Sequence, residues 1–121
     1  MIMEIEKLRR VTFTEDESAF LSLNGMARVA TVSPDLQPHV VPVVYEFDGT
    51  SFYFSGWNLE KSLKFRNIVQ NSRVAMVFDD LASVSPWHPR GIEIRGRAEV
   101  AYASGKPYVK VVPSTKTSWG L

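Results

Sequence analysis

The stretch RVATVSPDLQPHVVPVVYEFDGTSFYF, from Arg28 to Phe54, decides the fold because it holds three strand-like runs separated by turns. Two of the runs flank the segment SPDLQP at 33–38. The third follows Asp48-Gly49, which is a strong hairpin signal between strands. Consecutive hairpins predict that these strands pair in an antiparallel sheet.

Three further strands are predicted downstream, in RVAMVFDD (73–80), GIEIRGRAEVAY (91–102) and PYVKVV (107–112). The second of these alternates cleanly between an apolar and a charged face. The apolar face holds Ile92, Ile94, Ala98 and Val100, and the charged face holds Glu93, Arg95, Arg97 and Glu99. Gly96 stands where a side chain is expected and predicts a bulge or a barrel corner. Six short strands predict a mainly β fold, a small six-stranded antiparallel barrel that forms one domain over residues 1–121.

Two short helices complete the predicted fold. Thr14 with Glu17 three residues later matches a capping box, and Asn24-Gly25 is a natural stop for that helix. A second helix is expected near 59–70, with Asn58 as its candidate cap. Its apolar positions, Leu59, Leu63 and Phe65, form a narrow stripe.

The run HVVPVVYEF at 39–47 is apolar on both faces of a strand. Val40 and Val44 share one side, and Val41, Val43 and Tyr45 share the other. A strand of a lone antiparallel barrel normally has one wet face, so we expect the second face to pack on another copy of the chain in a homodimer. The alternative is that the terminal helix covers it.

Composition excludes several classes of function. The net charge of +1 over 121 residues does not favour a nucleic-acid partner. With no cysteine and only His39 and His88, disulfides and thiolate chemistry are excluded and no metal site is expected. The N-terminal MIMEIEKLRR matches neither a signal peptide nor a membrane span, so we expect a cytoplasmic protein without a membrane partner.

A polar cluster stands at the head of the second helix, in the sequence SLKFRN at 62–67. Ser62, Lys64, Arg66 and Asn67 combine a hydroxyl, two cations and an amide near helix N–H groups, which suits a phosphate. The alternative is a solvated helix face with Lys64 and Arg66 directed to water.

Several segments together resemble the pyridoxamine 5'-phosphate oxidase-like, flavin-binding split-barrel superfamily. SLKFRNIVQNSRVAMV (62–77) is similar to its helix-and-strand signature, and RVATVSPDLQPHVVPVVYEF (28–47) is similar to its first hairpin. The tail VVPSTKTSWGL (111–121) resembles its closing strand. DDLASVSPWHPRGIEIRGRAEV (79–100) resembles the branch that depends on the deazaflavin coenzyme F420. The resemblance covers most of the chain from Met26 onward.

The resemblance implies a Greek-key split barrel that binds coenzyme F420 or FMN, with Ser62 and Lys64 as the phosphate pair. The implied cofactor-binding residues are Thr31, His39, Val41, Pro42, Ser55, Gly56, Trp57, Ser62, Lys64, Arg66 and Asn67. The sequence departs from the family pattern at Leu63, Leu36 and Ser72, where a basic residue, a glycine and a proline are usual.

The implied function is an oxidoreductase that transfers hydride between F420 or FMN and an unidentified small organic substrate, with the chemistry supplied by the cofactor. No residue is assigned as catalytic. His39 is either a proton donor or simply a polar strand residue. The alternatives are a non-catalytic flavin, deazaflavin or haem carrier, and a structural dimer whose slot is filled by Phe52, Phe54, Phe65 and Trp57.

Four further side chains have two interpretations each. Trp57 belongs to the core or an interface, or it stacks on a ligand. Trp87 caps a pocket or plugs the space under its loop. Arg95 and Arg97 pair with Glu93 and Glu99, or they reach an anionic cofactor tail across the dimer.

Overall fold

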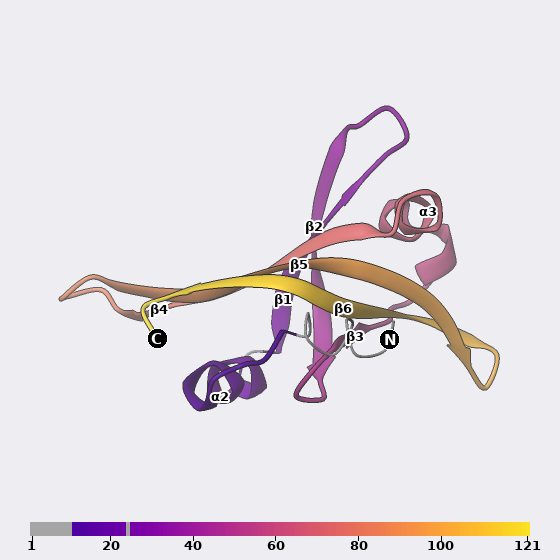
Figure 1. Cartoon of the computed structure of the whole chain (residues 1–121). Coiled ribbons are helices and arrows are strands. Elements are labelled where there is room, and N and C mark those ends of the chain that lie inside the picture. Colours follow the sequence, from indigo (N-terminus) through magenta and orange to yellow (C-terminus); the bar gives the residue numbers. More distant parts are fainter. Residues whose placement is uncertain (1–10, 24) are drawn as a thin grey trace, which may run out of the picture.

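The computed structural model describes residues 11–23 and 25–121, in which six strands form a closed barrel (Figure 1). Around the barrel the order is β1-β2-β3-β6-β5-β4, and these neighbours pair antiparallel. The strands are β1 Met26–Val32, β2 Pro38–Phe47, β3 Phe52–Phe54, β4 Arg73–Ser83, β5 His88–Ala103 and β6 Lys106–Trp119. The predicted six-stranded antiparallel barrel is confirmed, and the last three strands are longer than the sequence pattern indicated.

Helix α2 (Glu15–Leu23) begins at the predicted capping box. The Thr14 N–H donates to Glu17 Oε1 at 2.8 Å, and the Glu17 N–H donates to Thr14 Oγ1 at 3.1 Å. The two bonds satisfy helix N–H groups that would otherwise lack partners. The helix ends at Leu23, as the following Asn24-Gly25 predicted, although Asn24 itself lies outside the described residues.

The single helix predicted over 59–70 is wrong, because the segment is two helices with a break between them. A 3₁₀ turn, η1, covers Leu59–Lys61, and helix α3 covers Leu63–Gln70. Ser62 between them has extended backbone angles (φ −75°, ψ 152°) and caps α3 with its side chain. Asn58 stands at the start of η1 with φ 56°, and its side chain makes no capping hydrogen bond.

The barrel interior is a continuous apolar core to which both helices contribute. Phe52 and Phe78 are fully buried, with ring centroids 4.8 Å apart. Helix α3 adds Phe65 and Ile68, while Leu63 of the predicted stripe is exposed. Figure 1 shows α2 and α3 on opposite sides of the barrel.

The predicted bulge at Gly96 is confirmed by a register shift between Arg95 and Gly96 in the β5–β6 pairing. A Cβ atom built on Gly96 would lie 2.2 Å from the Val112 carbonyl oxygen. Only glycine allows β6 to approach β5 this closely. The shift places residues 114 and 115 of β6 beside residues 95–97, where the groove described below is found.

The outer face of β2 is not covered by α2. Val40 and Val44 are 62% and 69% exposed, whereas Val43 and Tyr45 are buried on the inner face. Helix α2 packs at that inner side, where the Tyr45 hydroxyl donates to the Leu21 carbonyl at 2.7 Å. The terminal-helix explanation of the second apolar face is therefore wrong for α2, and the homodimer remains a prediction. Within the described residues, no helix has the length and apolar character that a membrane span requires.

Candidate functional site

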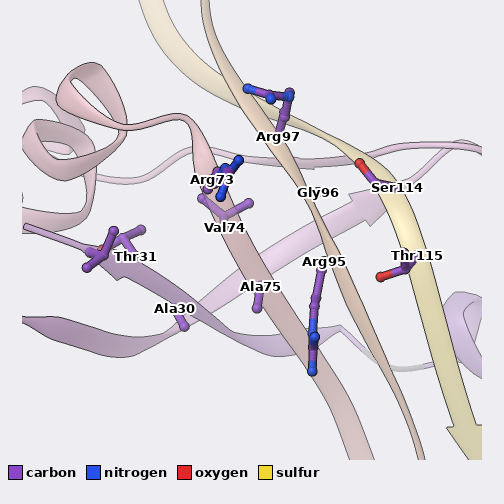
Figure 2. A pocket seen from close by; sticks show the side chains of 11 residues that line it. Ala30, Thr31, Arg73, Val74, Ala75, Arg95, Gly96, Arg97, Ser114 and Thr115 are labelled. Carbon is purple, nitrogen blue, oxygen red and sulfur yellow. The ribbon is translucent and has the colours of Figure 1, made fainter. Parts of the chain in front are cut away.

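An open groove of about 540 Å³ crosses the outside of the barrel (Figure 2). It runs over four strands and is lined by residues 30–32 of β1, 73–75 of β4, 95–97 of β5 and 114–115 of β6. The volume lies within the roughly 300–1,000 Å³ usual for small-molecule sites. Its floor carries alanine and valine side chains, and its walls carry arginines and hydroxyls, so it suits a ligand with both apolar and anionic parts.

Three arginines give the groove its charge. Arg73 and Arg97 are direct register partners on β4 and β5, and Arg95 follows on the same outer face of β5. Arg95 Nε lies 3.3 Å from Glu93 Oε1, and Arg97 Nη1 donates to Ser72 Oγ at 3.2 Å. Of the predicted pairings with Glu93 and Glu99, the described residues therefore show only the first, and it runs along β5 rather than across strands.

The phosphate site predicted at the head of α3 contains a hydroxyl that is already engaged. Ser62 Oγ donates to the Leu59 carbonyl at 2.6 Å and accepts the Phe65 N–H at 3.3 Å. Lys64 is half-buried and Arg66 exposed, and neither forms an ion pair with a described residue. The two cations are thus available to an anion, whereas the Ser62 proton would have to turn away from Leu59.

Asn67 and Thr31 meet although they are far apart in the sequence. Asn67 Nδ2 donates to Thr31 Oγ1 at 3.0 Å, and the two residues are 2% and 3% exposed. Thr31 also lines the groove, so this bond connects α3 to the strand that forms one edge of it. In the described chain, both side chains position the site rather than face solvent.

His39 lies directly opposite Thr31 in the β1–β2 register. Its Nδ1 atom is buried and is the one buried side-chain nitrogen or oxygen without a hydrogen-bond partner among the described residues. A buried polar atom left unpaired costs roughly 1–3 kcal/mol, so this atom marks a place where a further partner fits. Val41 lies on the same face of β2, whereas Pro42 points outward, so these three predicted residues do not line a single slot.

Ser55, Gly56 and Trp57 form an exposed connection between β3 and η1. Trp57 is 94% exposed, so its interpretation as a core residue is wrong, and its role in stacking remains a prediction. Trp87 is 67% exposed, which excludes the interpretation as a hydrophobic plug. His88 Nε2 lies 2.9 Å from the Gly120 carbonyl, which ties the start of β5 to the C-terminal end.

The hypothesis of a slot filled by aromatic side chains is wrong. Phe52, Phe54 and Phe65 are 0%, 2% and 8% exposed and belong to the barrel core, not to the groove. Trp57 stands outside the core altogether. The groove is lined instead by small apolar side chains, hydroxyls and arginines.

The sequence analysis missed Arg73, Ser114 and Thr115 as site residues. The sequence pattern predicts only that Arg73 begins a strand and that Ser114 and Thr115 lie in a segment that resembles the closing strand of the family. They come together only because β4 pairs with β5 and the Gly96 bulge sets the position of β6. The one available signal was the charged face of β5, on which Arg95 and Arg97 already stood out.

The residues present fit a phosphorylated flavin or deazaflavin. Lys64 and Arg66, which form no ion pair with a described residue, suit its phosphate, and the apolar floor at Ala30 and Ala75 suits a flat ring. His39 Nδ1 is a buried polar atom without a hydrogen-bond partner in the described part of the chain. Such a group would supply the hydride chemistry, and the chain would supply binding and orientation.

The chain is similar to known proteins of one enzyme family. The family model described as pyridoxamine 5'-phosphate oxidase matches residues 13–118. A 5a,11a-dehydrotetracycline/5a,11a-dehydrooxytetracycline reductase of Streptomyces rimosus subsp. rimosus is 34% identical over 120 residues, covering 90% of this chain and 84% of that protein.

Solved structures share the fold at low sequence identity. A structure named F420 reductase superposes with a TM-score of 0.71 at 22% identity, covering 87% of this chain and 98% of the other. A FAD-binding protein from Mesorhizobium loti gives 0.73 at 16% identity, covering 89% and 95%. These two likenesses support the barrel architecture. The family match over residues 13–118 and the relative that is 34% identical show that the chain belongs to the pyridoxamine 5'-phosphate oxidase family of oxidoreductases.

Proposed function

We propose that this protein is a homodimeric reductase that binds coenzyme F420 or FMN and transfers hydride between it and a small organic substrate. The observation that carries the proposal is the groove, in which an apolar floor and three arginines lie together on the outer face of a barrel of this family. The similar Streptomyces rimosus protein is named as a reductase and one structural neighbour as an F420 reductase, which favours reduction of an organic acceptor.

Each part of the site has a separate task in this proposal. Lys64 and Arg66 hold the cofactor phosphate, and Thr31, fixed by Asn67, shapes the edge of the groove beside it. His39 Nδ1 is placed to bond a ring or side-chain atom of the ligand. No side chain of the described residues is assigned to the chemical step, because a bound flavin or deazaflavin carries the hydride itself.

The homodimer is supported by the largely apolar outer face of the β1–β2 hairpin, defined here as Met26, Ala30, Val40, Pro42 and Val44; Arg28, opposite Pro42 on this face, is paired with Asp79. The register pairs Met26 with Val44 and Ala30 with Val40, so these side chains share one face. Ala30 also lines the groove, so a partner seated on this face would stand at the edge of the ligand site.

The test is direct titration of F420 and of FMN, followed by fluorescence, against the wild type and Lys64→Ala. A charge-assisted hydrogen bond is worth roughly 1.5–3 kcal/mol, so Lys64→Ala should raise Kd at least about tenfold. Lys106→Ala, at the exposed start of β6, is the matched control and should leave Kd unchanged.

Two results would count against the proposal. If neither cofactor changes its fluorescence with micromolar wild-type protein, the cofactor assignment fails. If a cofactor binds but is neither reduced nor oxidised with any reductant or acceptor tried, the carrier hypothesis is favoured; a Soret band lost in His39→Ala or His88→Ala would identify a haem carrier.

A further inference from the structure

The tip of the β1–β2 hairpin holds a leucine in a backbone conformation that leucine rarely adopts. Leu36 has a φ of 67° and is 76% exposed. Among the described residues, the other two non-glycine residues with positive φ are Asn58 and Ser104, which have small polar side chains. A bulky side chain in this left-handed region is an outlier, because its Cβ atom crowds the backbone. Leu36 therefore combines backbone strain with the exposure of a large apolar side chain.

Hydrogen bonds within the turn hold Leu36 in this conformation. The Leu36 N–H donates to the Ser33 carbonyl at 2.9 Å, and the Ser33 N–H donates to the Gln37 carbonyl at 3.1 Å. The Ser33 hydroxyl accepts the Gln37 N–H at 3.1 Å and donates to Asp35 Oδ1. Backbone strain that is held in place in this way clusters at functional sites. Glycine would fit the turn without strain, so a leucine here indicates a task for its side chain.

Leu36 stands at the end of a row of exposed apolar residues on the β1–β2 hairpin. Figure 1 shows this hairpin extending well beyond the rest of the barrel, so its tip lies away from the barrel core. Along the outer face below the tip, Val40, Val44 and Met26 are 62%, 69% and 59% exposed. Met26 and Val44 are register partners, so their side chains stand side by side. Leu36 and this pair lie at opposite ends of the same hairpin.

The spacing of these residues fits a contact between two copies of the hairpin. In a two-fold contact the same surface meets itself, so residues equally far from the axis on either side meet each other. Leu36 and Val44 each lie four residues from Val40, a separation of roughly 13 Å at about 3.3 Å per residue. Two hairpins that pack antiparallel about Val40 therefore bring Leu36 of one copy to Val44 of the other.

This packing buries no unpaired charge. Arg28 lies opposite Pro42, which is two residues from Val40, and its guanidinium is 2.7 Å from the Asp79 carboxylate. Because Arg28 is off the axis, its two copies stand on opposite sides of the axis and do not face each other. A buried charge without a partner would oppose association, whereas a paired charge is tolerated.

We propose that Leu36 is the anchor that sets how two copies of this chain pack. The two hairpins lie antiparallel across a two-fold axis at Val40, and Leu36 of each copy is buried against Met26 and Val44 of the other. The inference rests on the homodimer of the proposed function and goes beyond it by naming the axis and the residues that meet. Burial of Leu36 in the dimer offsets the strain of its turn, which stays uncompensated in a monomer.

The test is cysteine cross-linking of the full chain, which contains no cysteine of its own. The reagent is a bismaleimide that spans about 10 Å, the distance between packed sheets. Val40→Cys should link to its own copy, because Val40 lies on the axis. Leu36→Cys and Val44→Cys should not form covalent dimers singly, whereas Leu36→Cys/Val44→Cys should. A link within one chain is excluded, because the two positions are roughly 25 Å apart along the hairpin.

A second measurement uses Leu36→Gly, which removes the anchor and relieves the strain of the turn. Circular dichroism should show a folded protein, since glycine accepts a φ of 67°. The dimer dissociation constant, measured by native mass spectrometry over a dilution series, should rise at least about a hundredfold, because the lost side chain counts twice in a two-fold dimer. The matched control is Val84→Ala in the β4–β5 turn, where Val84 is 71% exposed, and it should leave the dissociation constant unchanged.

The inference is overturned if Val40→Cys does not link to its own copy, or if Leu36→Cys alone links as fully as the double substitution. It is also overturned if Leu36→Gly dimerises as tightly as the wild type. A wild-type dimer without these cross-links would remove this inference and leave the proposed function standing. A monomeric wild type would remove the inference together with the homodimer, while titration of F420 and FMN would still decide the cofactor.

Discussion

At the scale of single residues, the bond between Asn67 and Thr31 joins the helix to the barrel at the edge of the groove. Both side chains are almost fully buried, and the bond spans 3.0 Å. A buried hydroxyl that loses its only side-chain partner carries the full cost of desolvation. This bond, together with the buried side chains of Phe65 and Ile68, therefore holds α3, and with it Lys64 and Arg66, against the barrel.

Asn67→Leu should lower the free energy of unfolding by roughly 1–3 kcal/mol, because the substitution leaves Thr31 Oγ1 unpaired in the interior. Urea denaturation followed by circular dichroism measures the change. Asn71→Ala is the control, since Asn71 caps only the exposed Arg73 N–H at 3.0 Å and should cost less. Equal losses of unfolding free energy in the two variants would show that the buried Asn67–Thr31 bond stabilises the fold no more than the exposed Asn71 bond does.

At the scale of elements, the ion pair between Glu17 and Lys116 joins helix α2 to strand β6. Lys116 Nζ lies 2.5 Å from Glu17 Oε1, and the Glu17 carboxylate also accepts the Thr14 N–H of the capping box. Burial by itself would raise the pKa of Glu17, but hydrogen bonds from Lys116, Thr14 and Ser118 outweigh it and lower the pKa from 4.5 to about 2. The charged form of Glu17 is therefore the one that the folded state favours.

The free energy of unfolding should decrease as the pH is lowered from about 4.5 toward about 2, because the Glu17 carboxylate becomes protonated in this range. A group whose pKa is depressed by folding contributes stability above its ordinary value of 4.5, and that contribution is lost as the pH falls toward about 2. Glu17→Gln keeps an acceptor for the capping box but removes the charge, so it should destabilise at neutral pH by roughly 1.5–3 kcal/mol and flatten the acid slope.

Unfolding free energies between neutral pH and acid measure both effects. Glu15→Gln, on the first turn of the same helix but exposed, should retain the wild-type slope. A Glu17→Gln protein with the wild-type acid profile would show that another carboxylate controls acid unfolding.

At the scale of the whole molecule, the barrel carries an apolar face that the described chain leaves open. Val40 and Val44 are 62% and 69% exposed, and Met26 beside them is 59% exposed. The face continues through Ala30 into the arginine groove. Subunit contact and ligand binding are therefore expected to influence each other.

Val44→Glu should convert the proposed dimer into a folded monomer. In a two-fold dimer each substitution acts twice, so losing the burial of this valine alone removes about 3 kcal/mol or more of association free energy. Native mass spectrometry measures the subunit count, and circular dichroism confirms the fold. Val84→Glu, on the equally exposed β4–β5 hairpin, is the control and should remain dimeric. A wild-type protein that is monomeric at micromolar concentration would contradict the prediction.

Local sequence patterns were sufficient to predict the strands, the hairpin at Asp48-Gly49, the capping box at Thr14 and the bulge at Gly96. Each of these depends on interactions among neighbours along the chain: side-chain alternation, turn chemistry and the absence of a Cβ atom. The break at Ser62 was not predicted. The helical pattern of residues 59–70 does not show that the chain changes direction at Ser62, because that change depends on packing against the barrel strands.

Only the tertiary structure decided which outer-face residues meet. Closure of β1 onto β4 and the pairing of β4 with β5 bring Ala30, Arg73 and Arg97 into one groove. The same closure places Thr31 under Asn67. The sequence determined the residues and their faces, because these follow from short-range periodicity. Their contacts were decided by strand register, which depends on packing between segments distant in the chain.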